Sequence, residues 1–398
     1  MMMASTLAAV QEIRRSQRAD GPAAVLGIGT ANPAYSVLQD EYPDYYFRIT
    51  KKEHLTGLKD TFSKLCRISG LRRRFFHHTE QVLNAHPGLL QSLDARLDIV
   101  AKAAPELAAS AAAKAIAEWG RPAADITHLI VATNSEARSP GADLALASLL
   151  GLRPGVRRTA LQLNGCSAGC AALRLARTSP RTAAARACSW PASSSPSPPS
   201  VALTKVTPST PSSRRRSSAT APAPSSSAPT PTPPASARSS FEMVCALQTM
   251  IPGTEQLLHM HLGEGGIDGD VSTKVPHLLS AEHLRRCLVD AFGPVAAAIG
   301  VEGKWNELFW AVHPGSHRIL DHIDSALGLE PKKLEASRAV VRDYGNMLSA
   351  TVIFVLDELR RRMEDQEGDG AECTWGVMLG FGPGFTVETM VLLHSRSS

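Results

Sequence analysis

The chain has 398 residues, enough to bury a large core and to hold two domains or two halves of one. Its net charge is +5, but residues 177–240 hold eight of the 42 Lys and Arg residues and no Asp or Glu. Subtracting those eight leaves 34 basic against 37 acidic residues, so the positive charge belongs to one segment and argues against a nucleic-acid partner.

The chain shows no sign of export or of a membrane span. It contains no run of 18 apolar residues, and residues 1–20 lack an apolar segment with a cleavage site. We expect those residues to be disordered or helical and the protein to be cytoplasmic. The seven cysteines are odd in number and include no CxxC pair, so we expect neither a disulfide framework nor a zinc site. As a separate expectation, the protein uses no cofactor.

The first part of the chain alternates strand and helix patterns. Apolar runs at 23–28 and 126–132 predict strands, and patterns of helical spacing predict helices at 42–50, 54–69, 94–118 and 143–150. The helix at 54–69 carries Lys64 within a basic cluster that continues to residue 74. Such a cluster suits a phosphate-bearing ligand, and a solvated charged face explains it equally well.

Residues 161–170, LQLNGCSAGC, form the most informative stretch. A strand-like approach enters a small-residue turn, and a helical run follows at 170–176. This arrangement places Cys166 at a helix N-terminus, where the helix dipole favours a thiolate, the nucleophile of thioester exchange. The alternative is a buried cysteine that behaves as a small hydrophobic residue.

Two later stretches offer partners for a cysteine nucleophile. His313 follows a predicted buried strand at 308–312, and Asn346 precedes the apolar run at 350–356. A histidine could take the thiol proton and lower the pKa of Cys166, and an asparagine amide could stabilise an oxyanion. A core histidine and a helix-capping asparagine are the alternatives. Further helices at 280–299, 319–327 and 334–344 and strands at 242–249 and 375–379 predict a layered α/β fold.

Four separated motifs, NGCSAGCAALRLA at 164–176, FWAVHPG at 309–315, DYGNMLSATVIFVLDELRR at 343–361 and GFGPGFTVET at 380–389, resemble the plant type III polyketide synthases. These are the chalcone and stilbene synthases, and the resemblance is greatest to their curcuminoid synthase-like branch in grasses. It implies a thiolase-like layered αβαβα fold of two similar halves, at 21–240 and 241–398, and a homodimer.

The resemblance also implies the chemistry and its residues. Cys166 would carry an acyl starter delivered as a CoA thioester, and His313 and Asn346 would decarboxylate malonyl-CoA and stabilise the enolate. Lys64 matches one of three CoA-binding basic positions; Thr61 and Ile68 replace the other two. Other matching positions line the substrate cavity or its rim: Asn134, Ser135, Ser139, Gly269, Leu348, Gly382 and Pro383.

Residues 177–240 break the pattern. They hold 13 of the 27 prolines and no Gly, Asp or Glu, so we expect disorder there and the loss of two central strands. One choice of codons for residues 177–190, read one base earlier, encodes KDLAENSRGARVLV. The same offset can turn 219–229 into GDGAGAVIVGA, and both match the family. We therefore hypothesise a frameshift that opens near Arg177 and closes near Phe241.

Two classes of function follow from these observations. The first is a type III polyketide synthase that condenses a CoA-linked, phenylpropanoid-type starter with malonyl-CoA. The second is an inactive, pseudogene-like or misannotated paralogue, because loss of two central strands would disturb the packing of the two halves around Cys166. A thiolase-type or fatty-acid condensing enzyme is a weaker third interpretation.

Overall fold

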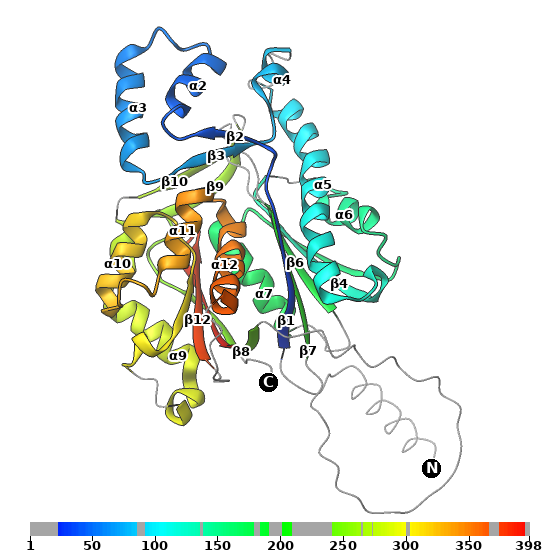
Figure 1. The fold of residues 1–398 in the computed structure, drawn as a ribbon, viewed down its shortest axis with the longest axis vertical. Coiled ribbons are helices and arrows are strands. Elements are labelled where there is room, and N and C mark those ends of the chain that lie inside the picture. Colours follow the sequence, from blue (N-terminus) through cyan, green and yellow to red (C-terminus); the bar gives the residue numbers. More distant parts are fainter. Residues whose placement is uncertain are drawn as a thin grey trace, which may run out of the picture.

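The computed structural model describes residues 23–85, 92–135, 138–178, 184–190, 201–208, 241–263, 266–272, 274–299, 303–365 and 374–394. Within these ranges the dominant feature is a nine-stranded sheet of order β11-β12-β13-β8-β1-β7-β6-β4-β5 (Figure 1). Its strands are β1 (Ala23–Ala31), β4 (Ile126–Thr133), β5 (Arg157–Gln162), β6 (Ala184–Trp190), β7 (Val201–Pro208), β8 (Phe241–Met250), β11 (Phe309–Val312), β12 (Thr374–Gly382) and β13 (Thr386–His394).

The sheet consists of two similar halves. The series β1-β7-β6-β4 pairs antiparallel, antiparallel and then parallel, and the series β8-β13-β12-β11 repeats that pattern. The two series meet at β1 and β8, which pair antiparallel. The layered fold of two similar halves expected from the sequence is therefore confirmed.

Helices cover both halves of the sheet in layers. One outer layer contains α5 (Leu93–Trp119) and α6 (Ala142–Leu149), and the other contains α9 (Ala281–Ile299) and α10 (His317–Leu327). Between them lie α7 (Ala168–Thr178) and α12 (Thr351–Asp365), whose buried residues share one core cluster (Figure 1). The remaining helices are α2 (Tyr42–Ile49), α3 (Thr56–Ile68), α4 (Glu80–Ala85), α8 (Val275–Leu278) and α11 (Glu335–Tyr344).

Small residues let α5 lie directly on β1. A side chain at Gly27 or Gly29 would collide with the backbone of α5 at Ala115 or Ala111. The helix has clear ends: the Ser92 hydroxyl accepts a hydrogen bond from the Ala95 N–H, and Gly120 ends the helix in the left-handed conformation. The alanine-rich pattern at 94–118 thus belongs to a helix whose small side chains allow its backbone to lie close to β1.

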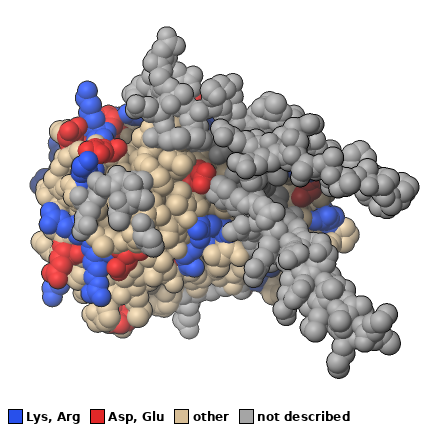
Figure 2. Space-filling model, turned by 90° about the horizontal axis from the view of Figure 1, so that it is seen from below, with Lys and Arg blue, Asp and Glu red and all other residues tan. Residues whose placement is uncertain are grey.

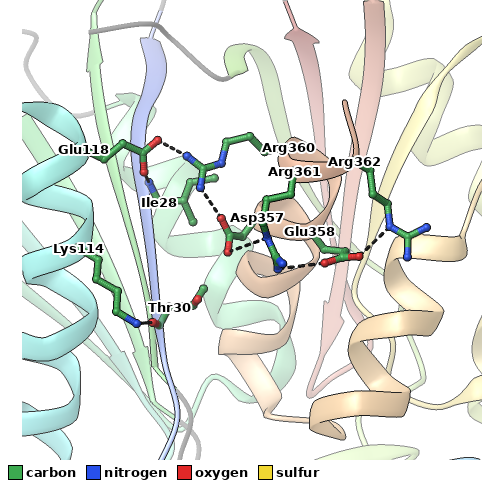
Figure 3. Close-up of polar contacts among 9 residues, drawn as sticks. All are labelled: Ile28, Thr30, Lys114, Glu118, Asp357, Glu358, Arg360, Arg361 and Arg362. Carbon is green, nitrogen blue, oxygen red and sulfur yellow. Dashed lines mark hydrogen bonds and ion pairs between the residues drawn. The ribbon is translucent and has the colours of Figure 1, made fainter. Parts of the chain in front are cut away.

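Polar side chains join the two halves beside β1 (Figure 3). The Glu118 carboxylate accepts a hydrogen bond of 3.0 Å from the Ile28 N–H and pairs with Arg360 of α12. Two residues further along β1, the Thr30 carbonyl accepts a bond of 2.7 Å from the Lys114 ammonium. Side chains of α5 thus satisfy backbone groups of β1 beyond Val25, where its described pairing with β8 ends.

Two segments of the interval 177–240 belong to the described structure and form strands. Residues 184–190 and 201–208 form β6 and β7, which fill the sheet between β1 and β4. The physical reason is local: neither segment has an internal proline, and Val201, Thr204 and Val206 favour a strand. Residues 177 and 178 belong to α7, and the rest of the interval lies outside the described residues, as do residues 1–20.

Some short elements do not appear in the sequence prediction. Two two-stranded sheets, β2 (Tyr35–Leu38) with β3 (Arg73–Phe76) and β9 (Leu258–Gly263) with β10 (Gly266–Val271), lie outside the main sheet, and β13 follows a glycine-rich turn. No helix within the described ranges is long and apolar enough to cross a membrane. On the face seen in Figure 2, described basic and acidic side chains are interspersed rather than separated by sign.

Candidate active site

The predicted nucleophile lies at the turn that joins β5 to α7. Cys166 is the middle residue of a short 3₁₀ turn, Gly165–Ser167, and α7 begins immediately after it. Gly165 has a φ of +61°, and a Cβ at this position would collide with the Pro383 ring. Only glycine fits such a backbone beside such a neighbour, so Gly165 defines how the chain enters Cys166.

Asn346 reaches this turn from the other half of the protein. Its Nδ2 donates to the Cys166 sulfur at 4.0 Å and to the Gly315 carbonyl at 3.2 Å. Its Oδ1 accepts from the Leu348 N–H at 2.9 Å, and the Thr351 hydroxyl lies 3.4 Å away. These contacts fix the orientation of the amide, with its N–H donors toward the sulfur, as oxyanion stabilisation requires.

His313 follows β11 and is anchored through its backbone, because its N–H donates to the Leu379 carbonyl at 2.8 Å. Its side chain is fully buried and packs edge-on against Phe381, with ring centroids 5.5 Å apart. Neither ring nitrogen has a hydrogen-bond partner among the described residues. The loop of His313 meets Asn346 at Gly315, two residues further along the chain.

The electrostatics differ from the sequence expectation of a thiolate. Burial raises the pKa of the Cys166 thiol to about 12, although the hydrogen bond from Asn346 opposes this shift. Burial also lowers the pKa of the His313 imidazole to about 3. For the half-buried Cys166, desolvation is the larger of these two opposing effects, and His313 is not among the groups that shift the pKa of its thiol. At neutral pH Cys166 is therefore a neutral thiol and His313 an unprotonated imidazole.

The glycine-rich turn after β12 packs on the nucleophile turn. Pro383 lies against Gly165, and a side chain at Gly382 would collide with Ser167. Met260 of β9 links this turn to Gly269: its sulfur lies 3.4 Å from a Cβ built at Gly165, and its Cγ lies 3.2 Å from one built at Gly269. Of the predicted wall residues, Gly382 and Pro383 therefore contact the nucleophile turn directly. Gly269 is connected to that turn through Met260.

The predicted starter-pocket residues take different positions. Asn134 is fully buried, and its amide bonds the backbone of Gly165. Ser135 is buried next to it, and its hydroxyl has no partner among the described residues. Ser139 is exposed. Of these three, the structure places only Asn134 in direct contact with the nucleophile turn.

Leu348 and Lys64 complete the predicted set. Leu348 is half-buried with a φ of +51°, and its N–H donates to the side-chain Oδ1 of Asn346. Lys64 is exposed on α3, and no described hydrogen bond or ion pair connects it to Cys166, His313 or Asn346. The structure therefore brings Leu348 into the Asn346 loop and leaves Lys64 on the surface of a separate helix.

Several residues at the site have no counterpart in the sequence prediction. The Thr351 hydroxyl accepts from the Met347 N–H at 2.7 Å and donates to the Leu348 carbonyl at 2.8 Å, which shapes the Asn346 loop. Ser349 and Met260 also contact the site. A threonine at the start of a helix is a recognisable signal, whereas the role of Met260 depends on a hairpin far away in the sequence.

Comparison with known proteins identifies the class to which this fold and site belong. The N-terminal domain of chalcone and stilbene synthases matches residues 10–186, and the C-terminal domain matches residues 242–396. The chain belongs to the chalcone and stilbene synthase family. It is 51% identical over 405 residues to bisdemethoxycurcumin synthase of Oryza sativa subsp. japonica, in an alignment that covers 99% of this chain and 98% of that protein.

Proposed function

We propose that this protein is a type III polyketide synthase that condenses a CoA-linked, phenylpropanoid-type starter with malonyl-CoA. One observation carries the proposal: the Asn346 amide donates both to the Cys166 sulfur and to the loop that carries His313. Membership of the chalcone and stilbene synthase family and the similarity to bisdemethoxycurcumin synthase support this reaction and this starter class.

The loading step transfers the starter from CoA to Cys166. The thiol proton moves to a ring nitrogen of His313 as the sulfur attacks the thioester carbonyl. The carbon–sulfur bond to CoA then breaks, and the CoA sulfur takes the proton back from His313. Burial lowers the pKa of His313, so its imidazole is unprotonated at neutral pH and has a ring nitrogen available for the thiol proton.

The extension step uses the amide of Asn346. Malonyl-CoA loses CO2, and the electron pair of the broken carbon–carbon bond forms an enolate of acetyl-CoA. The Asn346 amide stabilises the enolate oxygen through the N–H donation that is directed toward the sulfur carrying the acyl group. The enolate carbon attacks the acyl carbonyl, the bond to Cys166 breaks, and the extended chain leaves as a CoA thioester.

The wall residues do not specify a particular product. Gly269 packs closely against the backbone of His259 and the side chain of Met260, and Leu348 adds an apolar side chain two residues after Asn346. Ser135, Ser139 and Lys64 remain proposed contacts for the starter, the cavity rim and CoA. We further propose a cytoplasmic homodimer whose CoA-thioester substrates are its only small-molecule partners, with no cofactor.

Purified protein incubated with p-coumaroyl-CoA and [2-14C]malonyl-CoA tests the proposal. We expect a covalent acyl group on the Cys166 peptide and radiolabelled condensation products by liquid chromatography and mass spectrometry. Absence of both, with folded protein, contradicts the proposed function and favours the inactive paralogue. A labelled Cys166 without products would place the failure in the extension step.

A further inference from the structure

The side chain of Asn134 bonds both backbone groups of the residue that precedes Cys166. Its Oδ1 accepts from the Gly165 N–H at 2.7 Å, and its Nδ2 donates to the Gly165 carbonyl at 3.3 Å. Asn134 is fully buried at the end of β4, so these bonds are formed away from water. A carboxamide that bonds both the N–H and the C=O of one residue fixes the position of that residue more tightly than either bond alone.

Gly165 has an unusual backbone conformation that its surroundings must hold in place. Its φ of +61° is a conformation that side chains disfavour, and the Pro383 ring closes one side of it. Glycine has the largest conformational freedom of any residue, so the turn needs partners that restrict it. The amide of Asn134 supplies those partners one residue before the nucleophile.

Asn134 also reaches the loop that carries Asn346. Its Nδ2 lies 3.5 Å from the hydroxyl oxygen of Ser349, three residues after Asn346. The backbone carbonyl of Ser349 in turn lies against Gly169, near the start of α7, where a Cβ would collide with it. One buried side chain therefore contacts both segments whose catalytic groups meet at the Asn346–Cys166 contact.

We propose that Asn134 is a positioning residue that holds the Cys166 sulfur and the Asn346 amide in register for condensation. This inference rests on the proposed function and deepens it. It differs from the expectation that Asn134 lines the starter pocket: both N–H groups of its amide are directed to Gly165 and Ser349, and the side chain is fully buried. Its loss should therefore impair the chemical steps more than the binding of the starter.

Two substitutions at Asn134 and one at Ser349 separate the contacts. Asn134→Leu removes all three bonds at similar volume. Asn134→Asp keeps the acceptor for the Gly165 N–H and replaces the donors with a carboxylate facing the Gly165 carbonyl. Ser349→Ala removes only the longest bond. Thr389→Val is the control, because Thr389 is a buried residue of β13 whose hydroxyl has no partner within the described structure.

The first readout separates kcat from KM in condensation. Displacement of a catalytic group by about 1 Å can cost about a hundredfold, so we expect Asn134→Leu to lower kcat at least about tenfold with the starter KM within about threefold. Ser349→Ala should lower kcat by about threefold, and Thr389→Val should match the parent. A large rise in KM at unchanged kcat would assign Asn134 to the starter pocket and overturn the proposal.

The second readout does not need polyketide activity. Alkylation of Cys166 by iodoacetamide, followed on its peptide by mass spectrometry across pH 7–11, reports whether Asn346 still donates to the sulfur. Loss of that donation removes a contact that lowers the thiol pKa. We therefore expect the profiles of Asn134→Leu and Asn134→Asp to shift to higher pH, with Thr389→Val unshifted.

These readouts also cover the case in which one variant does not fold. If Asn134→Leu is unfolded by circular dichroism, Asn134→Asp and Ser349→Ala decide the question by the same two measurements. Unchanged kcat and unchanged alkylation in a folded Asn134→Asp would overturn the proposal. If the parent protein makes no product, the proposed function fails, whereas the alkylation shift still tests whether Asn134 positions the sulfur.

Discussion

Asn346 donates its side-chain N–H to the sulfur of Cys166 at 4.0 Å, although the two residues are 180 positions apart in the sequence. Cys166 comes from the turn before α7 in the first half, and Asn346 precedes α12 in the second. These two helices share the central layer of the fold, which explains why the site forms where the two halves meet.

Replacement of Cys166 with Ala should abolish covalent loading of the starter, because the sulfur is the proposed acyl carrier. Cys170 should not take over, since it is buried in α7 against Gly380 and burial raises the pKa of its thiol well above the ordinary value. Intact-mass spectrometry after incubation with p-coumaroyl-CoA measures the loading. Cys170→Ala is the matched control and should still load; acyl transfer to Cys170 in the Cys166→Ala variant would contradict the assignment.

Replacement of Asn346 with Ala should slow malonyl-CoA decarboxylation more than starter loading. An oxyanion donor typically contributes about a hundredfold to a thousandfold to the rate, and Asn346 is the amide directed at the sulfur. Release of 14CO2 from carboxyl-labelled malonyl-CoA gives the first rate, and acylation of Cys166 gives the second. Equal losses in both would indicate that Asn346 supports the structure of the turn rather than the enolate.

The reactivity of Cys166 should rise throughout the neutral range of pH. Its folded thiol pKa is raised to about 12 and that of His313 is lowered to about 3, so neither group titrates between pH 5 and 9. The thiolate fraction then increases about tenfold with each pH unit. The rate of alkylation by iodoacetamide, measured on the substrate-free protein, should follow it without a plateau. A plateau below pH 7 would reveal a thiolate–imidazolium pair and contradict the neutral state.

The motifs were sufficient to predict the layered fold and the three candidate catalytic residues, because apolar periodicity and strand ends are local signals. Contacts made by distant residues were not predictable: nothing near Asn134 indicates that its amide reaches Gly165, and Met260 acts from a hairpin that carries no motif. The pKa of the Cys166 thiol likewise depends on how distant residues pack around it, which no local pattern records.

The described part of the interval 177–240 bears on the inactive alternative. Loss of two central strands was the reason for that alternative, and β6 and β7 occupy the sheet between β1 and β4. The inactive alternative is therefore not favoured.

The frameshift remains a hypothesis about the coding DNA. We expect transcript sequences to show one frame shift near codon 177 and a compensating one near codon 241. Transcripts that encode the printed residues without either change would refute it. A protein restored to the other frame, assayed beside the present one at equal concentration, would show how far the change affects turnover.

Gly165 should be intolerant of even the smallest side chain. Alanine at a φ of +61° costs about 1 kcal/mol or more in backbone strain, and its methyl group would also collide with the Pro383 ring. Because Gly165 immediately precedes Cys166, any relaxation of this clash moves the sulfur, and a shift of about 1 Å can cost about a hundredfold in rate. Urea unfolding and the loading rate of Gly165→Ala measure the two effects.

Gly57→Ala is the matched control: it lies in α3 with open space around it, and should leave both quantities unchanged or raise stability slightly. A Gly165→Ala protein as stable and as active as the parent would mean that the turn is not held as the structure describes.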